Sequence, residues 1–283
     1  LQLNGSLTLT NNKSIFNTNN INVSLKGDLI NNGTYNYGTN LTTFNGGVQS
    51  ISGSSVTNFY DLTVSPVTSL TVNNDFNVNR NLTIASGSLV LGNKKVILLG
   101  DLSNSGAYTD DNTTGGISLS GTVKQQISGT GSYGRLELNN NAGANLNNDI
   151  ALQNNLVLTK GILDINIFLL TLNQNSLIEG APFGLTKMVQ SDGVISNWGI
   201  RKFFPASPPS PFTFPSGVEG KYVPSVFTID ASAAPGSIRV NPVNNTHLSA
   251  TDPANALKFY WRVESNGISG FTGSGVFQYM PGD

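Results

Sequence analysis

Residues 81–102 read Asn81-Leu-Thr-Ile-Ala-Ser-Gly-Ser-Leu-Val-Leu-Gly-Asn-Lys-Lys-Val-Ile-Leu-Leu-Gly-Asp-Leu102. Short runs of alternating apolar and polar residues are separated here by Gly, Asn and Ser, which is typical of half-buried β-strands joined by turns. No stretch of the chain shows the helical spacing of apolar residues over three turns. A chain that turns this often, with two or three inward residues per strand, predicts an all-β fold of the parallel β-helix (β-solenoid) type.

A longer repeat surrounds this stretch, since four pairs of similar segments are separated by 75, 73, 76 and 74 residues. Self-similarity at a fixed period is typical of stacked folds, whereas a sandwich needs no internal repeat. We therefore predict a β-solenoid over residues 1–199, built from repeats of about 75 residues, each forming about three coils of roughly 20–25 residues. The pairs are Leu7-Thr-Leu-Thr10 with Leu82-Thr-Ile84, Gly27-Asp-Leu29 with Gly100-Asp-Leu102, Gln49-Ser-Ile-Ser-Gly53 with Gln125-Gln-Ile-Ser-Gly129, and Phe59-Tyr-Asp-Leu-Thr-Val64 with Tyr133-Gly-Arg-Leu-Glu-Leu138.

A right-handed path is favoured for this solenoid, because parallel crossover connections are right-handed in almost all proteins. Of the 38 Asn residues in the chain, 33 precede residue 200, and Asn side chains can stack as ladders between coils. An antiparallel sandwich or barrel is the alternative for residues 1–199, because its strands would have a similar spacing.

The composition changes near residue 200, where Asn becomes sparse and Pro frequent. We predict a Pro-rich extended connector over residues 200–216, because each Pro fixes φ and removes a backbone donor. Longer strands follow, and the apolar residues of the strand at 257–263 alternate onto one face. Residues 217–283 are therefore predicted to begin a β-sandwich-like module that is incomplete at its C-terminus.

The composition also bounds the function. Charged residues make up 11% of the chain and the formal net charge is −1, so no basic field exists to attract nucleic acid or an anionic membrane. The longest apolar runs fall far short of the ~20 residues that a membrane-spanning helix needs. The chain has no Cys, which favours a bacterial source for a secreted protein of this size. Because the chain starts at Leu1 without a signal segment, we expect it to be an internal piece of a longer polypeptide.

Several loose motifs point to a family. They are Gly46-Gly-Val-Gln-Ser-Ile-Ser-Gly53 before Phe59-Tyr-Asp-Leu-Thr-Val64, Gly161-Ile-Leu-Asp164 before Val194-Ile-Ser-Asn-Trp-Gly-Ile-Arg-Lys202, and Phe212-Thr-Phe-Pro-Ser-Gly217 before Tyr222-Val-Pro-Ser-Val226 and Tyr260-Trp-Arg-Val263. In these motifs most of the chain resembles the repeats, and the module that often follows them, of very large secreted surface proteins of Bacteroidota. The resemblance implies export by the type IX secretion route, a location outside the cell or on its surface, and an adhesin-like or structural role. It brings no catalytic residues with it.

Residues that could carry chemistry are few. His247 is the only histidine, so a Ser-His-Asp or Cys-His device would depend on it; without a G-x-S-x-G elbow we interpret it as a surface residue. A polysaccharide-cleaving solenoid would need carboxylates clustered on adjacent coils, and the acidic residues are scattered. Asp110 and Asp111 are the only adjacent pair. Their loop, with the Asn112 carbonyl, could hold calcium, although a solvated loop is the simpler interpretation.

Three further features have structural interpretations. Asp28 and Asp101 occupy equivalent positions in the repeat, which favours a role in turns over a role in catalysis. The Thr8-Leu-Thr10 pattern resembles an ice-binding array but is not repeated on successive coils. The indole rings of Trp198 and Trp261 could stack on sugars, yet packing in the core or between domains accounts for them better.

These observations predict a non-enzymatic structural or adhesive segment of a large bacterial surface or secreted protein, in the form of a rigid repeat stalk. We assign no catalytic, cofactor-binding or metal-binding residues and no cofactor. The expected partners are adjoining segments of the same polypeptide or other surface proteins, with glycans as a further candidate and with neither nucleic acid nor a membrane-spanning segment. The alternative is a carbohydrate-binding or carbohydrate-cleaving β-solenoid. A cleft lined by several carboxylates would favour an enzyme, and a smooth uncharged exterior would favour the stalk.

Overall fold

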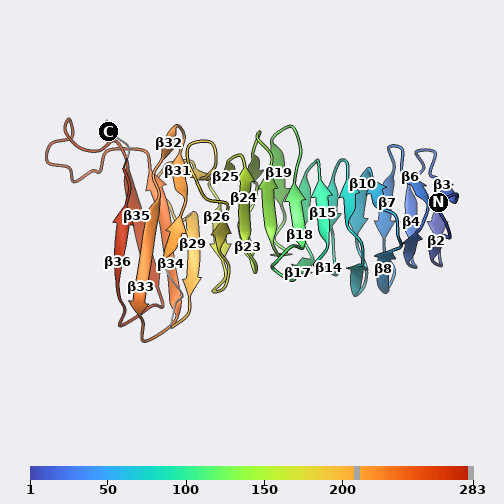
Figure 1. The fold of residues 1–283 in the computed structure, drawn as a ribbon. Coiled ribbons are helices and arrows are strands. Elements are labelled where there is room, and N and C mark those ends of the chain that lie inside the picture. The colour runs from blue at the N-terminus through green and yellow to red at the C-terminus, as the bar shows by residue number, and fades with distance from the viewer. Residues whose placement is uncertain (207–210, 280–283) are drawn as a thin grey trace.

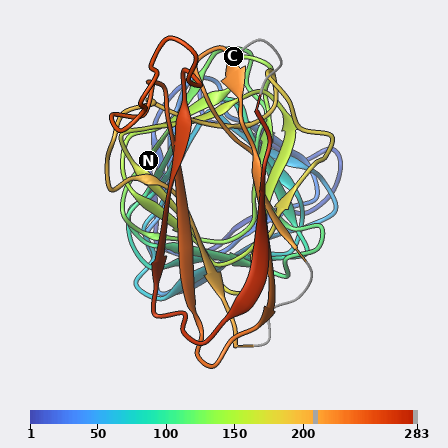
Figure 2. The ribbon, with the colours of Figure 1, turned by 90° about the vertical axis from the view of Figure 1, so that its left-hand side faces the viewer.

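The computed structural model describes residues 1–206 and 211–279, and the strands in these two ranges stack along a single long axis (Figure 1). No helix occurs in the described ranges. The chain forms an all-β parallel solenoid of about nine turns followed by an antiparallel region, which confirms the predicted fold class. Viewed along the axis, the turns superpose into one oval outline (Figure 2).

Each turn contributes one strand to each of three faces, because every third strand in the sequence pairs with the same sheet. Sheet 1 contains β1 (Gln2–Leu3), β4 (Val23–Leu25), β7 (Leu41–Phe44), β10 (Asp61–Val64), β13 (Leu82–Ile84), β16 (Leu102–Asn104), β19 (Gln125–Ser128), β22 (Ala144–Leu146), β25 (Leu163–Asn166), β28 (Val189–Ser191), β31 (Ser216–Val218) and β32 (Lys221–Tyr222). Sheet 2 contains β2 (Leu7–Leu9), β5 (Leu29–Asn31), β8 (Val48–Ser52), β11 (Ser69–Val72), β14 (Ser88–Gly92), β17 (Ala107–Asp110), β20 (Ser132–Tyr133), β23 (Ile150–Leu152), β26 (Leu169–Leu172), β29 (Gly199–Phe204), β34 (Gly236–Val243) and β35 (Tyr260–Asn266).

The third face is divided into two sheets. Sheet 3 contains β9 (Thr57–Phe59), β12 (Phe76–Val78), β15 (Lys95–Leu98), β18 (Gly116–Leu119), β21 (Leu136–Asn139), β24 (Leu156–Lys160) and β27 (Ile178–Glu179). A separate pair of strands, β3 (Ile15–Asn17) and β6 (Thr34–Asn36), begins this face, with β6 lying next to β9.

The length of a turn follows from the register of sheet 1. Val23 pairs with Thr42 and Leu163 with Val189, so one turn takes 19 to 26 residues between β1 and β28. The sequence forms strands here because period-2 alternation sends apolar side chains inward and polar ones outward. In β13, for example, Leu82 and Ile84 have no exposed surface. The inward residues of all three faces form one continuous core.

The sequence repeat does not coincide with a whole number of turns. Each repeat advances by eleven strands, as from β2 to β13 and from β8 to β19, which is three turns and two further faces. Equivalent residues therefore lie on different sheets: Gln49 is on sheet 2 and Gln125 on sheet 1. A repeat thus spans more than the expected three coils, because most turns take 19 or 20 residues, at or below the low end of the expected range of roughly 20–25.

Gln49 and Gln125 show how a corner is preserved. Both are buried, and each Nε2 donates to two backbone carbonyls of the preceding turn, those of Leu25 and Gly27 at 3.0 and 2.6 Å for Gln49. Gln125 donates in the same way to the carbonyls of Leu98 (3.1 Å) and Gly100. The Oε1 atom of each side chain accepts a backbone N–H from its own corner, at 2.6 Å for Gln49 and 2.8 Å for Gln125.

A glycine follows each of these glutamines for a steric reason. Gly53 and Gly129 have φ of +118° and +92°, which L side chains rarely adopt. A Cβ at either position would lie 2.2 Å from a carbonyl oxygen, that of Asn31 or of Asn104. The Gln-x-Ile-Ser-Gly motif is therefore a corner motif with two structural requirements.

The strands do not divide at residue 200. β29 lies inside the predicted connector at 200–216, yet it pairs in parallel with β26 and antiparallel with β34. β31 likewise pairs with β28, so sheets 1 and 2 both continue into the predicted module at 217–283. A separate sheet 4 of β30 (Phe212–Phe214), β33 (Ser225–Ala231) and β36 (Thr272–Phe277) is antiparallel, which is consistent with a sandwich. The orange and red strands of this region line two opposite sides of the oval (Figure 2).

Lys202 explains why the sequence pattern conceals β29. Its side chain points inward, where an apolar residue is expected, and its Nζ donates to the carbonyls of Asn173 (2.6 Å) and Gln174 (2.7 Å).

Within the described ranges, no helix is long and apolar enough to cross a membrane.

We expect Gln125→Leu to lower the free energy of unfolding by about 2–4 kcal/mol, because it removes the buried side-chain bonds to the Leu98 and Gly100 carbonyls and to the Gly121 N–H. Gln49→Leu should have a similar effect, since Gln49 makes the same three bonds to the backbone. Urea denaturation would measure both. The outward-facing Gln126→Leu is the control and should change the value by less than about 0.5 kcal/mol; an equally small effect of Gln125→Leu would contradict the assigned role.

Candidate functional site

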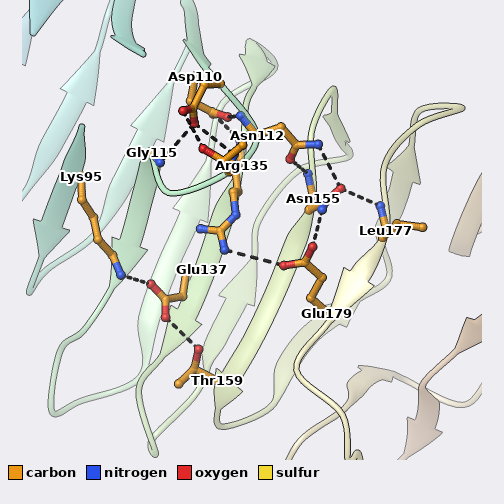
Figure 3. Close-up of polar contacts among 12 residues, drawn as sticks. Lys95, Asp110, Asn112, Gly115, Arg135, Glu137, Asn155, Thr159, Leu177 and Glu179 are labelled. Atoms are coloured by element: carbon orange, nitrogen blue, oxygen red, sulfur yellow. Dashed lines mark hydrogen bonds and ion pairs between the residues drawn. The ribbon is translucent and has the colours of Figure 1, made fainter. Parts of the chain in front are cut away.

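Chemically active side chains gather on the outward face of sheet 3, where Lys95, Glu137, Thr159 and Glu179 project from β15, β21, β24 and β27 (Figure 3). Ser118 lies opposite Glu137 on β18, the strand between β15 and β21. Alternation along each strand explains this placement, because the neighbouring residues point into the core. This cluster is the strongest candidate for a site on the solenoid.

Glu137 is the centre of the cluster and only 8% of its surface is exposed. Its Oε2 lies 2.5 Å from Lys95 Nζ, and its Oε1 accepts a hydrogen bond from the Thr159 hydroxyl at 2.7 Å. Burial alone would raise the pKa of Glu137, but the hydrogen bonds from Lys95, Thr159 and Ser118 outweigh it and lower the pKa below the ordinary value of 4.5. Glu137 is therefore an anion at neutral pH, which does not suit a general acid.

Glu179 is held in a comparable way. Its Oε2 lies 3.7 Å from the Arg135 guanidinium, and its Oε1 accepts a hydrogen bond from Asn155 Nδ2 at 2.5 Å. The two carboxylates that face the same side of sheet 3 are thus each paired with a cation. An acid/base pair for glycoside cleavage needs one carboxyl with a raised pKa, and Glu137 shows the opposite shift.

The loop with Asp110 and Asp111 folds against this cluster (Figure 3). Asp110 Oδ2 accepts the backbone N–H of Arg135 at 2.5 Å, and its Oδ1 accepts the N–H of Asn112 at 2.8 Å and the Asn154 amide at 2.7 Å. These carboxylate oxygens already have N–H donors, whereas a calcium ion would require them as ligands.

Asp111 forms a local turn in the same loop. Its carboxylate accepts the hydroxyl of Thr113 at 2.6 Å and the N–H of Thr113 at 3.0 Å, and these hydrogen bonds lower its pKa. Asn112 then reaches Asn155, whose backbone N–H donates to its Oδ1 at 2.8 Å. The loop therefore fastens β17 to the corner before β24. Over the described residues, no group of three or more His, Cys, Asp or Glu side chains gathers as a metal site would require.

His247 lies far along the chain from this cluster, in the antiparallel region. Its ring stacks edge-on against Tyr260 with centroids 4.7 Å apart, and its Nδ1 accepts the N–H of Ser249 at 3.2 Å. In the described part of the chain its side chain makes no hydrogen bond to a carboxylate, as a triad would need.

The chain matches no protein-family model, and neither the curated proteins nor the solved structures give a significant match.

The tryptophans are held by packing and hydrogen bonds. Trp261 Nε1 donates to the Val223 carbonyl at 2.8 Å, and its ring lies 5.1 Å from those of Phe259 and Phe277. Trp198 Nε1 donates to Asp192 at 2.9 Å. These contacts agree with the packing interpretation.

Asp28 and Asp101 each accept a backbone N–H from the following turn, at 2.7 and 2.8 Å. This is a shared structural role at equivalent positions of the repeat. Thr8 stacks on Ile30, so the Thr8-Leu-Thr10 pattern is not continued. Thr43 and Thr63 do stack in register, but in a column one residue wide.

The sequence alone does not mark Lys95, Arg135, Glu137 or Glu179. The contact between Lys95 and Glu137 joins strands two turns apart, so it depends on the exact lengths of the intervening turns. A one-residue error in either length would place a side chain on the opposite face. The outward positions of sheet 3 can be assigned to neighbouring side chains only when the register between its strands is known.

We expect Glu137→Gln to lower the free energy of unfolding by about 1–3 kcal/mol at neutral pH, because Lys95 loses a buried, charged partner. The lowered pKa means that this stabilisation is present above the ordinary glutamate value and is lost as the pH falls through the folded-state value. The difference between wild type and variant should therefore shrink in acid. Urea denaturation across this pH range tests it, with the exposed Glu219→Gln as the control; a pH-independent difference would contradict the ion pair.

Proposed function

We propose that this chain is a rigid, non-enzymatic spacer and adhesive segment of a large secreted or cell-surface bacterial protein. The observation that supports it best is the continuity of the stack: the same three faces and one core run through about nine turns (Figure 1). Parallel strands are spaced by about 4.8 Å, so nine turns extend the chain by roughly 40 Å. The strands of each turn pair only with those of the turns before and after it, so more turns add length without changing the cross-section.

Stiffness follows from the bonds between turns. Besides the backbone ladders, polar side chains join one turn to the next, as in the Asn77–Asn58 contact at 2.7 Å and the Asn173–Gln153 contact at 2.8 Å. These neutral bonds are not screened by salt, unlike surface ion pairs. Such a surface suits conditions outside a cell.

The paired charges on sheet 3 support a non-enzymatic role. Glu137 and Glu179, the carboxylates closest to a catalytic arrangement, are each bound to a cation and to a hydrogen-bond donor. The resemblance to Bacteroidota surface proteins supports a location outside the cell and export by the type IX route. In that setting the partners are adjoining segments of the same polypeptide or other surface proteins.

We expect small-angle X-ray scattering to give one elongated, compact particle whose profile is the same at low and at high salt, because few ion pairs hold the turns together. The dimensionless Kratky plot should be bell-shaped, as for a folded rod. A plateau at high angle, or a shape that expands with salt, would argue against a rigid spacer.

We also expect no hydrolase or lyase turnover of pectin, alginate, xylan or host glycans, because Glu137 and Glu179 are each bound to a cation and to a hydrogen-bond donor, and the pKa of Glu137 is lowered where acid catalysis needs a raised one. Reducing-sugar release and absorbance of unsaturated products would measure this. Glu137→Gln serves as the matched variant: turnover by the wild type that disappears in it would overturn the non-enzymatic assignment.

A further inference from the structure

A hollow of about 570 Å³ lies on the flank of the solenoid, at the edge where sheet 3 passes into sheet 1. Three successive corners build it: the turn at Asn141, the end of β24 at Thr159 and Lys160, and the loop at 182–187. It is separate from the paired carboxylates of sheet 3, although Thr159 belongs to both.

The loop that forms the outer wall is an insertion. On sheet 1 the turn from Leu163 to Val189 takes 26 residues, whereas the preceding turn from Ala144 to Leu163 takes 19. The extra residues close on themselves through two backbone bonds between Gly184 and Lys187, at 3.0 and 2.9 Å, and join none of the sheets. Insertions in solenoids map to loops on one face, and that face is often the binding face.

The hollow carries positive charge without a compensating acid. Lys160 and Lys187 line it, and none of its nine lining residues, all within the described chain, is acidic. The side chain of Lys160 is exposed and forms no hydrogen bond or ion pair with another described residue, and Lys187 Nζ donates to the Gly180 carbonyl. The third lysine along this edge, Lys124, is by contrast paired with Asp164 at 3.1 Å. The two lining lysines therefore favour an anionic ligand.

The other walls suit a sugar ring. Phe183 is half-buried against the core and lines the hollow, so it offers a fixed apolar surface. Asn141 and Thr159 are exposed at the rim and provide an amide and a hydroxyl that can bond sugar hydroxyls. A site with one apolar wall and a few polar groups of fixed position is typical for a small polar ligand.

We propose that this hollow binds an acidic sugar unit of a polysaccharide. The carboxylate or sulfate of the sugar pairs with Lys160 and Lys187, and the ring lies on Phe183. This binding is independent of the spacer role, because a rod without the hollow would still be a rod.

Isothermal titration with an oligogalacturonate and with a sulfated oligosaccharide tests the proposal and distinguishes the two sources of negative charge. Saturable binding of either one is expected, weakening at high salt. A fully methyl-esterified oligogalacturonate, which keeps the rings but removes the charge, should bind at least about tenfold more weakly. Failure of both acidic probes to bind, or equal binding of the ester, would overturn the proposal.

Lys160→Gln should weaken the acidic probe by about fivefold or more, since a charge-assisted hydrogen bond is lost. This side chain is exposed and unpaired, so the variant should fold normally. Lys26→Gln, an exposed lysine at the other end of the solenoid, is the matched control and should bind like wild type. Phe183→Ala should also weaken binding, with thermal unfolding as the check on its fold. An effect of Lys160→Gln no larger than that of Lys26→Gln would place the ligand elsewhere.

Discussion

The backbone hydrogen bonds between one turn and the next impose the constraint on which the whole structure depends. Each strand of the solenoid pairs in parallel with strands about one turn earlier and later, so the chain must return to the same face in register, one strand spacing further along the axis. The corners absorb every difference in turn length, and this is where the specific chemistry lies. Buried Gln49 and Gln125 each bond two backbone carbonyls of the preceding turn, and Gly53 and Gly129 permit a backbone approach that a Cβ would block.

This constraint also decides where the molecule can vary. Outward side chains on the strands can change without disturbing the ladder, whereas extra residues are accommodated only at corners. The loops at 110–116 and 180–188 are both corner loops of this kind. The polar groups of the loop at 110–116 form hydrogen bonds to other turns. The loop at 180–188 joins none of the sheets and forms a wall of the hollow that Lys160 and Lys187 line.

Much of the fold could be predicted from the sequence because period-2 alternation and frequent turn residues report directly on strands and corners. The continuation of the solenoid past residue 200 could not, because β29 carries Lys202 at an inward position and is followed by a Pro-rich segment. Burial lowers the pKa of Lys202 to about 8, and its amine bonds two carbonyls and lies near the rings of Phe204 and Phe212. The contacts of Glu137 could not be foreseen either, since they join turns whose lengths differ by a few residues. The sequence indicated the Asp110–Asp111 loop as a candidate site. The donors that Asp110 receives from Arg135 and Asn154 could not be predicted, because those residues are distant in the sequence.

The mismatch between the repeat and the turn has a consequence for how such a molecule grows. One repeat advances the chain by eleven strands, so each tandem copy is rotated by two-thirds of a revolution relative to the one before. Every inward position must therefore be acceptable on all three faces, and a duplication inserted by recombination extends the core without a seam. A surface patch copied in this way lies on a different face of the solenoid in each of three successive copies. It returns to the original face in the fourth copy. An array built from these units would display each patch around its whole circumference, and its contacts would not depend on which side of the rod met a neighbour.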